Sequence, residues 1–443
     1  MVSYKPAGPR QLLQTHTSSV PYAKMPAPMG SIRLGQSAWK FVQSPLVVAC
    51  IAFGIRFWAA YQLLPQKAGP FFYNRNEPAR IAWALVTGYG YSSPWPNTPL
   101  QPTAQQPPAY PLLVAAVFKV FGTYTMSSLW TAVLLNAIFA TLTAVAILEI
   151  GRRDFGPSVG VVAAWIWACW LYEAAVSIRL WENALSALWL TLSLLFLSRV
   201  AVSARARSWL LFGLLAGAAA LTNTTLLALF PFFWLWLWFS SKAESRIRVR
   251  LLLASVAACI LLLLPWTIRN YAAFHRIIPV RDNLGLEFWL GNNEGAPDRV
   301  EPDFPLLNPS EYNRLGEINF MEEKSQLGKQ FVRQHPRQFL RLTIRRVRLF
   351  WIEPERSLWR WISLLAWIGA FLAFRHKAAA AVPYLTALLI FPLVYYVTHT
   401  FPTYRHPIEP AMLILASYTL VCAAELTMGM LVGERAPLRA SGR

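Results

Sequence analysis

Long apolar runs recur through most of this chain and constrain its fold more than any other feature. Each approaches the ~20 residues with which a helix crosses the hydrocarbon core of a membrane. Of the 443 residues, 56% are hydrophobic and 14% are charged, which is too apolar for a water-soluble domain of this size. We therefore predict an all-α polytopic membrane protein with about ten transmembrane helices. The predicted spans are 46–64, 126–150, 159–176, 180–197, 209–222, 226–239, 251–268, 358–374, 380–398 and 408–428.

Basic residues mark one side of this predicted bundle. The formal net charge is +20. Lysines and arginines gather in four short connectors, at 152–153, 199–207, 242–250 and 375–377. Because cytoplasmic loops carry the excess of basic residues, we predict that these connectors and both termini are cytoplasmic. The charge therefore follows from topology, and we expect no nucleic-acid partner.

The same reasoning divides the chain into three parts. Residues 1–44 are polar and rich in proline and serine, which predicts a disordered cytoplasmic tail. Residues 45–428 form the membrane domain, whose first span is expected to be an uncleaved anchor, and residues 429–443 form a second cytoplasmic tail. The long loops 65–125 and 269–357 lie on the external side, because loops of this length cross the membrane largely regardless of charge.

The first external loop contains an ionisable cluster beside the membrane. Glu77 and Arg80 are spaced i, i+3, which places them on one face of a short helix that lies along the membrane surface. Asn76 precedes this helix, and Gln106 and Tyr110 flank a double proline that leads into a second interfacial helix ending near residue 121. Ionisable groups at this depth are unfavourable unless they serve a function. We interpret the cluster as the active site.

The second external loop begins with further polar clusters. Arg269, Asn270, Arg281, Asn292 and Asn293 lie just beyond a predicted span, where amides and charged groups can bind the hydroxyls of a polar ligand.

Two further features supply arginines. The last external turn adds Tyr404 and Arg405, and the latter can neutralise a phosphate. Arg337, Arg341, Arg345 and Arg348 recur at helical spacing after Pro336. This basic helix suits an interface anchor or the binding of lipid phosphates.

Structural alternatives exist for several of these residues. Glu77 can cap its helix and pair with Arg80, and Arg179 can pair with Glu182 in the same way. Arg56, within the first span, either extends to the interface or faces a polar cavity. The four cysteines lie in or at the ends of spans without a CxxC pair, and no metal-ligand spacing appears. We expect no metal and no cofactor.

Four motifs in this order resemble the GT-C superfamily of polytopic glycosyltransferases. They are the carboxylate after the first span, the Pro-Pro-aromatic segment, the second span ending in Gly151-Arg152-Arg153-Asp154-Phe155-Gly156, and the late Tyr404-Arg405-His406-Pro407. The resemblance is greatest to the branch that holds protein O-mannosyltransferases and the aminoarabinose transferase of lipid A. Two positions depart from that pattern. Asn76 stands where the family typically has an aspartate, and Gln106 stands where the lipid A branch has a lysine.

The resemblance implies transfer of a sugar from a polyprenyl-phosphate-linked donor to an acceptor hydroxyl, with inversion, on the external face of a membrane. It favours a bacterial inner membrane, and an endoplasmic reticulum membrane would satisfy the same topology. It implies Glu77 as general base, Asn76 as an orienting group, and Arg80, Arg269 and Arg405 as candidates to hold the phosphate. The partners would be the lipid-linked donor, membrane lipids, and a lipid, glycan or protein acceptor. The sugar and the acceptor stay open.

A lipid-phosphate transporter or flippase is the competing interpretation. It predicts polar residues or broken helices near the bilayer midplane. The sequence offers little there beyond Arg56, Asn136 and the cluster 222–225, whereas its polar chemistry lies outside the spans. A scaffold protein of the envelope would leave the external carboxylate, amide and arginine clusters unexplained.

Overall fold

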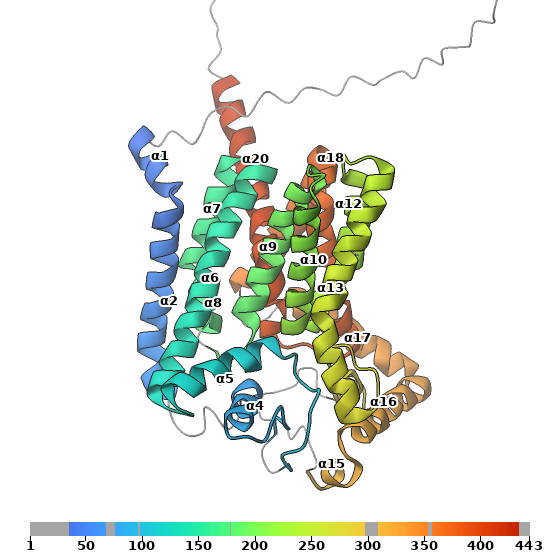
Figure 1. Cartoon of the computed structure of the whole chain (residues 1–443). Coiled ribbons are helices and arrows are strands. Elements are labelled where there is room, and N and C mark those ends of the chain that lie inside the picture. Colours follow the sequence, from blue (N-terminus) through green and yellow to red (C-terminus); the bar gives the residue numbers. More distant parts are fainter. Residues whose placement is uncertain are drawn as a thin grey trace, which may run out of the picture.

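The described chain is almost entirely helical. A computed structural model describes residues 35–67, 76–95, 98–177, 179–296, 309–352 and 357–433. Within these ranges the β-structure is a single isolated bridge between Ser92 and Pro102. Figure 1 shows a bundle of long helices with shorter helices gathered at its lower end, while α1 (Gln36–Val42) and the end of α20 (Glu409–Gly433) lie at the upper end. The predicted tails over 1–44 and 429–443 fall largely outside the described residues.

Six helices among the described residues are long and apolar enough to cross a membrane, or seven when the bent pair α7 and α8 counts as one span. The all-α polytopic prediction is confirmed. Most of these spans are α2 (Pro45–Lys67), α6 (Met126–Asp154), α9 (Asn183–Ala201), α13 (Ser245–Phe274) and α20. The remaining one joins α18 (Ser357–Ile390) to α19 (Leu393–Val397), and α18 itself contains a kink at Lys377. Shorter apolar helices stand beside them: α10 (Ala206–Thr222), α11 (Thr224–Leu227) and α12 (Phe230–Ser240).

The predicted span 159–176 is broken in the structure. It consists of α7 (Pro157–Cys169) and α8 (Leu171–Ser177), which meet at 61° because Trp170 adopts an extended conformation. The break removes the helical partners of the last carbonyls of α7. Arg56 replaces them, since its guanidinium donates to the carbonyls of Trp167 at 3.1 Å and Ala168 at 3.3 Å. Arg56 therefore caps a helix end inside the bundle.

Close helix contacts build the membrane core. Buried apolar side chains from α7, α9, α10, α18 and α20 form one cluster. Gly213 of α10 faces the backbone of α13, and a Cβ at this position would collide with the carbonyl oxygen of Ser255. Small residues at such contacts let helix backbones approach, which strengthens dispersion contacts in a lipid environment.

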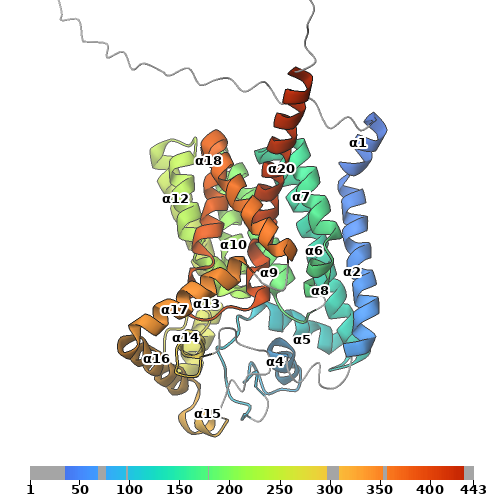
Figure 2. The ribbon, with the colours of Figure 1, turned by 180° about the vertical axis from the view of Figure 1, so that it is seen from behind.

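The lower end of the bundle carries two groups of short helices (Figures 1 and 2). The first group is α4 (Glu77–Val86) and α5 (Ala109–Phe121), which pack together where the two interfacial helices were expected. The second group is α14 (Leu284–Gly291), α15 (Pro309–Leu315), α16 (Glu317–Gln334) and α17 (Pro336–Trp351), with α14 packed on α16. The 3-10 helix η1 (Pro402–Ile408) completes this end.

Helix α17 is the basic helix that the sequence predicted. Its four predicted arginines are exposed. Arg346 is buried instead, and donates to the carbonyl of Gly291 and, at 3.3 Å, to Asn292. One arginine of this helix therefore fastens α17 to the end of α14.

Candidate active site

Glu77 is the first residue of α4. The preceding Asn76 is extended and Pro78 occupies the first turn, where its missing N–H leaves no bond unmade. A carboxylate at this position also interacts favourably with the positive end of the helix dipole. The two carboxylate oxygens accept hydrogen bonds from Nε1 of Trp95, at 3.1 Å, and from Nε2 of Gln106. The carboxylate is thus held from two sides by the loop that follows α4.

Burial raises the pKa of Glu77. The charge of Arg281 and the hydrogen bonds from Trp95 and Gln106 act in the opposite direction, and the charge of Glu287 adds to the increase. The net effect is a pKa above the ordinary range of a glutamate. The carboxyl is therefore a better proton acceptor than an exposed glutamate.

A second group of charged side chains borders the site and consists of Arg281, Glu287 and His399. Nη2 of Arg281 lies 3.3 Å from Oε1 of Glu287, and Nε2 of His399 pairs with Oε2 of the same carboxylate. Nε of Arg281 donates to the carbonyl of Gln105, next to Gln106. Burial alone would raise the pKa of Glu287, but the hydrogen bond and charge of His399, followed by Arg281 and Asn283, lower it. This carboxylate is therefore ionised at neutral pH.

Two more groups border the cluster. Glu182, the buried residue before α9, lies within range of the charges of Glu77 and Arg281. Tyr404 lies within range of Glu77, Arg281 and Glu287, and its ring is 5.5 Å from that of His399. Elements far apart in the sequence thus bring three carboxyl groups, an arginine, a histidine and a tyrosine together.

The described segments 91–95 and 98–106, which carry Trp95 and Gln106, are held in place by two residues from other elements. Arg269 donates from Nη1 to the carbonyl of Thr103 at 2.7 Å and from Nη2 to the carbonyl of Tyr91 at 2.8 Å. Glu317, at the start of α16, accepts from the hydroxyl of Thr103 and the N–H of Ala104, both at 2.6 Å. Arg269, which the sequence suggested as a phosphate ligand, here clamps the loop.

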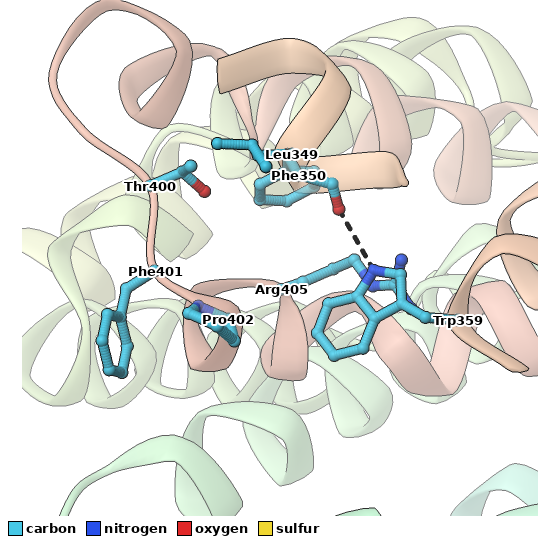
Figure 3. A pocket seen from close by; sticks show the side chains of 7 residues that line it. All are labelled: Leu349, Phe350, Trp359, Thr400, Phe401, Pro402 and Arg405. Carbon is cyan, nitrogen blue, oxygen red and sulfur yellow. Dashed lines mark hydrogen bonds between the residues drawn. The ribbon is translucent and has the colours of Figure 1, made fainter. Parts of the chain in front are cut away.

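Arg405 belongs to a different buried cluster. It pairs with Glu409, donates to Oγ of Ser363 at 2.8 Å, and lies 3.6 Å from the ring centroid of Trp359. Figure 3 shows it beside Trp359 in a small pocket that Thr400 and other residues line. The neighbouring His406 pairs with Glu173 of α8. None of these residues forms a hydrogen bond or ion pair with Glu77.

The other polar residues suggested by the sequence bond to the backbone or to one another. Tyr110 exchanges hydrogen bonds with Asn136. The amides of Asn270, Asn292 and Asn293 donate to carbonyls that include those of Ile278, Val397 and Trp289, respectively. These side chains hold the ends of α13 and α14 in place.

Asn76 and Arg80 flank Glu77 without bonding to it. The side-chain oxygen of Asn76 is buried and has no hydrogen-bond partner among the described residues. Burial lowers the pKa of Arg80, and the nearby Tyr124 acts in the opposite direction. The alternative in which Arg80 pairs with Glu77 is therefore not what the structure has, because Trp95 and Gln106 hold that carboxylate.

The structure brings together Glu77, Gln106, Arg281 and Tyr404 from the predicted set, and adds Trp95, Glu182, Glu287 and His399. The sequence signal for Glu287 was its place in the amide-rich segment after Arg281, but nothing local joined it to His399. Across the described residues no group of three or more His, Cys, Asp or Glu side chains is placed to hold a metal ion.

Fold and site together define a polytopic membrane protein with a carboxylate-rich site on the short helices at one end of its bundle. Residues 105–268 match the family model described as dolichyl-phosphate-mannose-protein mannosyltransferase. Among proteins of curated function, none matches the chain in sequence.

Solved structures resemble the chain over most of its length. The oligosaccharyltransferase of Archaeoglobus fulgidus in complex with Zn and sulfate has 13% identity and a TM-score of 0.55, over 89% of this chain and 51% of that chain. The archaeal oligosaccharyltransferase AglB from the same organism, with an inhibitory peptide and a dolichol-phosphate, has 12% identity and a TM-score of 0.54, over 92% and 53%. ArnT from Cupriavidus metallidurans, bound to undecaprenyl phosphate, has 15% identity and a TM-score of 0.49, over 90% and 64%.

The chain therefore shares the fold of the archaeal oligosaccharyltransferase structures, and residues 105–268 resemble the mannosyltransferase family. The chain spans about half the length of the two archaeal oligosaccharyltransferase chains.

Proposed function

We propose that this protein is an integral-membrane glycosyltransferase that moves a sugar from a polyprenyl-phosphate-linked donor to an acceptor hydroxyl. The observation that carries the proposal is the placement of Glu77, a half-enclosed carboxylate with a raised pKa, among Arg281, Glu287 and Tyr404. The match to a mannosyltransferase family model and the dolichol-phosphate in a structure of the same fold support the choice of donor.

In the proposed reaction the acceptor oxygen attacks the anomeric carbon as the bond from that carbon to the phosphate oxygen breaks. The bonding electrons leave with the phosphate, which is stable as an anion and needs no proton. Glu77 takes the proton of the acceptor hydroxyl. A carboxylate has about four lone-pair sites, so the two hydrogen bonds from Trp95 and Gln106 leave capacity for it. Attack opposite the leaving group inverts the anomeric centre.

The proposed side of the membrane follows from the position of the basic connectors. The junctions of α6 with α7 and of α12 with α13, and the bend of α18, lie at the end of the bundle opposite α4 (Figure 1). If the basic end is cytoplasmic, Glu77 faces the exterior. We place the protein in a bacterial inner membrane with its site on the periplasmic side.

The test uses purified protein in lipid nanodiscs, a panel of radiolabelled polyprenyl phosphate sugars, and native membrane extract as the source of acceptors. Transfer of label from at least one donor is the expected result. The same protein in vesicles is assayed for movement of labelled lipid phosphates between leaflets. Lipid movement without any transfer would replace the proposal with the flippase interpretation.

A further inference from the structure

His399 presents a buried nitrogen that nothing in the described chain uses. The side chain is 8% exposed, and its Nε2 pairs with Oε2 of Glu287. The other ring nitrogen, Nδ1, is buried and has no hydrogen-bond partner among the described residues. Buried polar atoms in native proteins are almost always paired, so this nitrogen has capacity to bond to a water or a ligand. A histidine held at one nitrogen by a carboxylate is also the arrangement with which proteins orient the other nitrogen toward a substrate.

The surroundings of His399 connect it to Glu77. Arg281 shares the Glu287 carboxylate with His399, and its charge acts on Glu77. The ring of Tyr404 lies 5.5 Å from that of His399 and within range of the same charges. His399 therefore belongs to the Glu77 site.

The proposed reaction needs positive groups for the departing phosphate, and two of the three arginines expected in this role bond to other groups. Arg269 donates to the carbonyls of Thr103 and Tyr91, and Arg405 is paired with Glu409. Near Glu77 the described groups that can carry positive charge and donate hydrogen bonds are Arg80 on the same helix, Arg281 and His399.

We propose that His399 is a catalytic residue that binds the phosphate of the lipid-linked donor through Nδ1, while Glu287 holds its ring. This inference rests on the proposed function and assigns the phosphate end of its donor. The ring carries both protons in this role: Nε2–H donates to Glu287 and Nδ1–H donates to a phosphate oxygen.

The step balances without proton transfer from His399. The bond from the anomeric carbon to the phosphate oxygen breaks, the bond to the acceptor oxygen forms, and the acceptor proton moves to Glu77. The phosphate gains negative charge as it leaves, so its hydrogen bond to the imidazolium strengthens in the transition state. Contacts that strengthen there accelerate the reaction.

Two substitutions test the roles of the two ring nitrogens of His399 separately. In His399→Gln the terminal amide reaches the position of Nε2, so the bond to Glu287 is kept and the group at Nδ1 is lost. In His399→Asn the shorter amide lies near the position of Nδ1, so the phosphate donor is kept and the bond to Glu287 is lost. His335→Gln, at the junction of α16 and α17, is the matched control.

The primary measurement is binding of undecaprenyl phosphate to each purified protein in nanodiscs. Loss of a hydrogen bond to a charged group is expected to weaken binding by about 10- to 100-fold in His399→Gln. His399→Asn should bind more tightly than His399→Gln, and the control should match the wild type. If His399→Gln binds as the wild type does while His399→Asn fails, the histidine only holds Glu287 and the inference is wrong.

Transfer assays distinguish this inference from the proposed function. Wild-type protein that binds the lipid phosphate but transfers no sugar would refute the function, and the order of the two variants in binding would still decide the role of His399. Wild-type protein that binds no polyprenyl phosphate would refute both.

Discussion

Glu317 joins the two groups of short helices, and its ionisation should make the stability of the protein depend on pH. Glu317 is 4% exposed. Burial raises its pKa from the ordinary 4.5 to about 7, although hydrogen bonds from Ala104, Thr103 and Tyr312 act against the increase. The folded state therefore holds this proton at pH values where the unfolded chain has released it.

Because proton binding is linked to folding, the two pKa values determine how the free energy of unfolding changes with pH. Below pH 4.5 both states are protonated, so the group contributes nothing. Between pH 4.5 and 7 the unfolded state loses the proton first, and the free energy of unfolding falls as the pH rises. Each pKa unit corresponds to about 1.4 kcal/mol, so the decrease amounts to about 3 kcal/mol and is complete above pH 7.

Glu317→Gln removes this dependence, because the amide is neutral at every pH and can still accept from the N–H of Ala104. The two proteins should melt at similar temperatures near pH 5. At pH 8 the melting temperature of the variant should exceed that of the wild type by roughly a few degrees. Melting followed by tryptophan fluorescence in detergent measures the difference, in which the titration of all other groups cancels. Glu322→Gln is the control, since Glu322 lies on the same helix at an exposed ion pair with Arg276. A difference that stays constant from pH 5 to pH 8 would refute the reasoning.

Three further perturbations test the site. Trp95→Phe removes a hydrogen bond that favours the charged form of Glu77, so the pKa of Glu77 should rise further. The acidic limb of the pH–rate profile should then move to higher pH. An unchanged limb would argue against Glu77 as the base. Gly291→Ala forces α14 away from the carbonyl of Thr398, with which its Cβ would collide, and should lower both the melting temperature and the rate of transfer. Gly295→Ala should change neither, because its Cβ would lie at an ordinary van der Waals distance of 3.6 Å from Oδ1 of Asn293. Arg269→Lys loses the paired hydrogen bonds to the carbonyls of Thr103 and Tyr91. The free energy of unfolding from denaturant titrations should fall by about 1–3 kcal/mol. A denaturation midpoint equal to that of the wild type would show that these two bonds do not hold the loop.

The sequence predicted helices better than it predicted the bends between them. Apolar length and interrupting charges located most spans, because these properties act locally. The break at Trp170 was missed, since it depends on Arg56 from another helix to satisfy the freed carbonyls of α7. Nothing within 159–176 records that distant partner.

The candidate site was predicted only in part for the same reason. Glu77 and Gln106 stood out because they lie close in sequence beside a span. The pairing of Glu287 with His399 joins residues separated by 112 positions, and no local pattern reports it. Arginines were the least predictable residues, because a guanidinium serves a backbone carbonyl as well as a phosphate. Arg269 and Arg346 do the former.

The most direct test of the account compares the rate of sugar transfer by the wild type and by Glu77→Gln, each in nanodiscs and each shown to melt cooperatively at a similar temperature. The amide fits the same space between Trp95 and Gln106 but cannot take the acceptor proton. A general base contributes about 10²- to 10⁴-fold, so transfer should fall by that factor while binding of undecaprenyl phosphate is retained. Transfer by Glu77→Gln at close to the wild-type rate would contradict the assignment of Glu77 as the catalytic base.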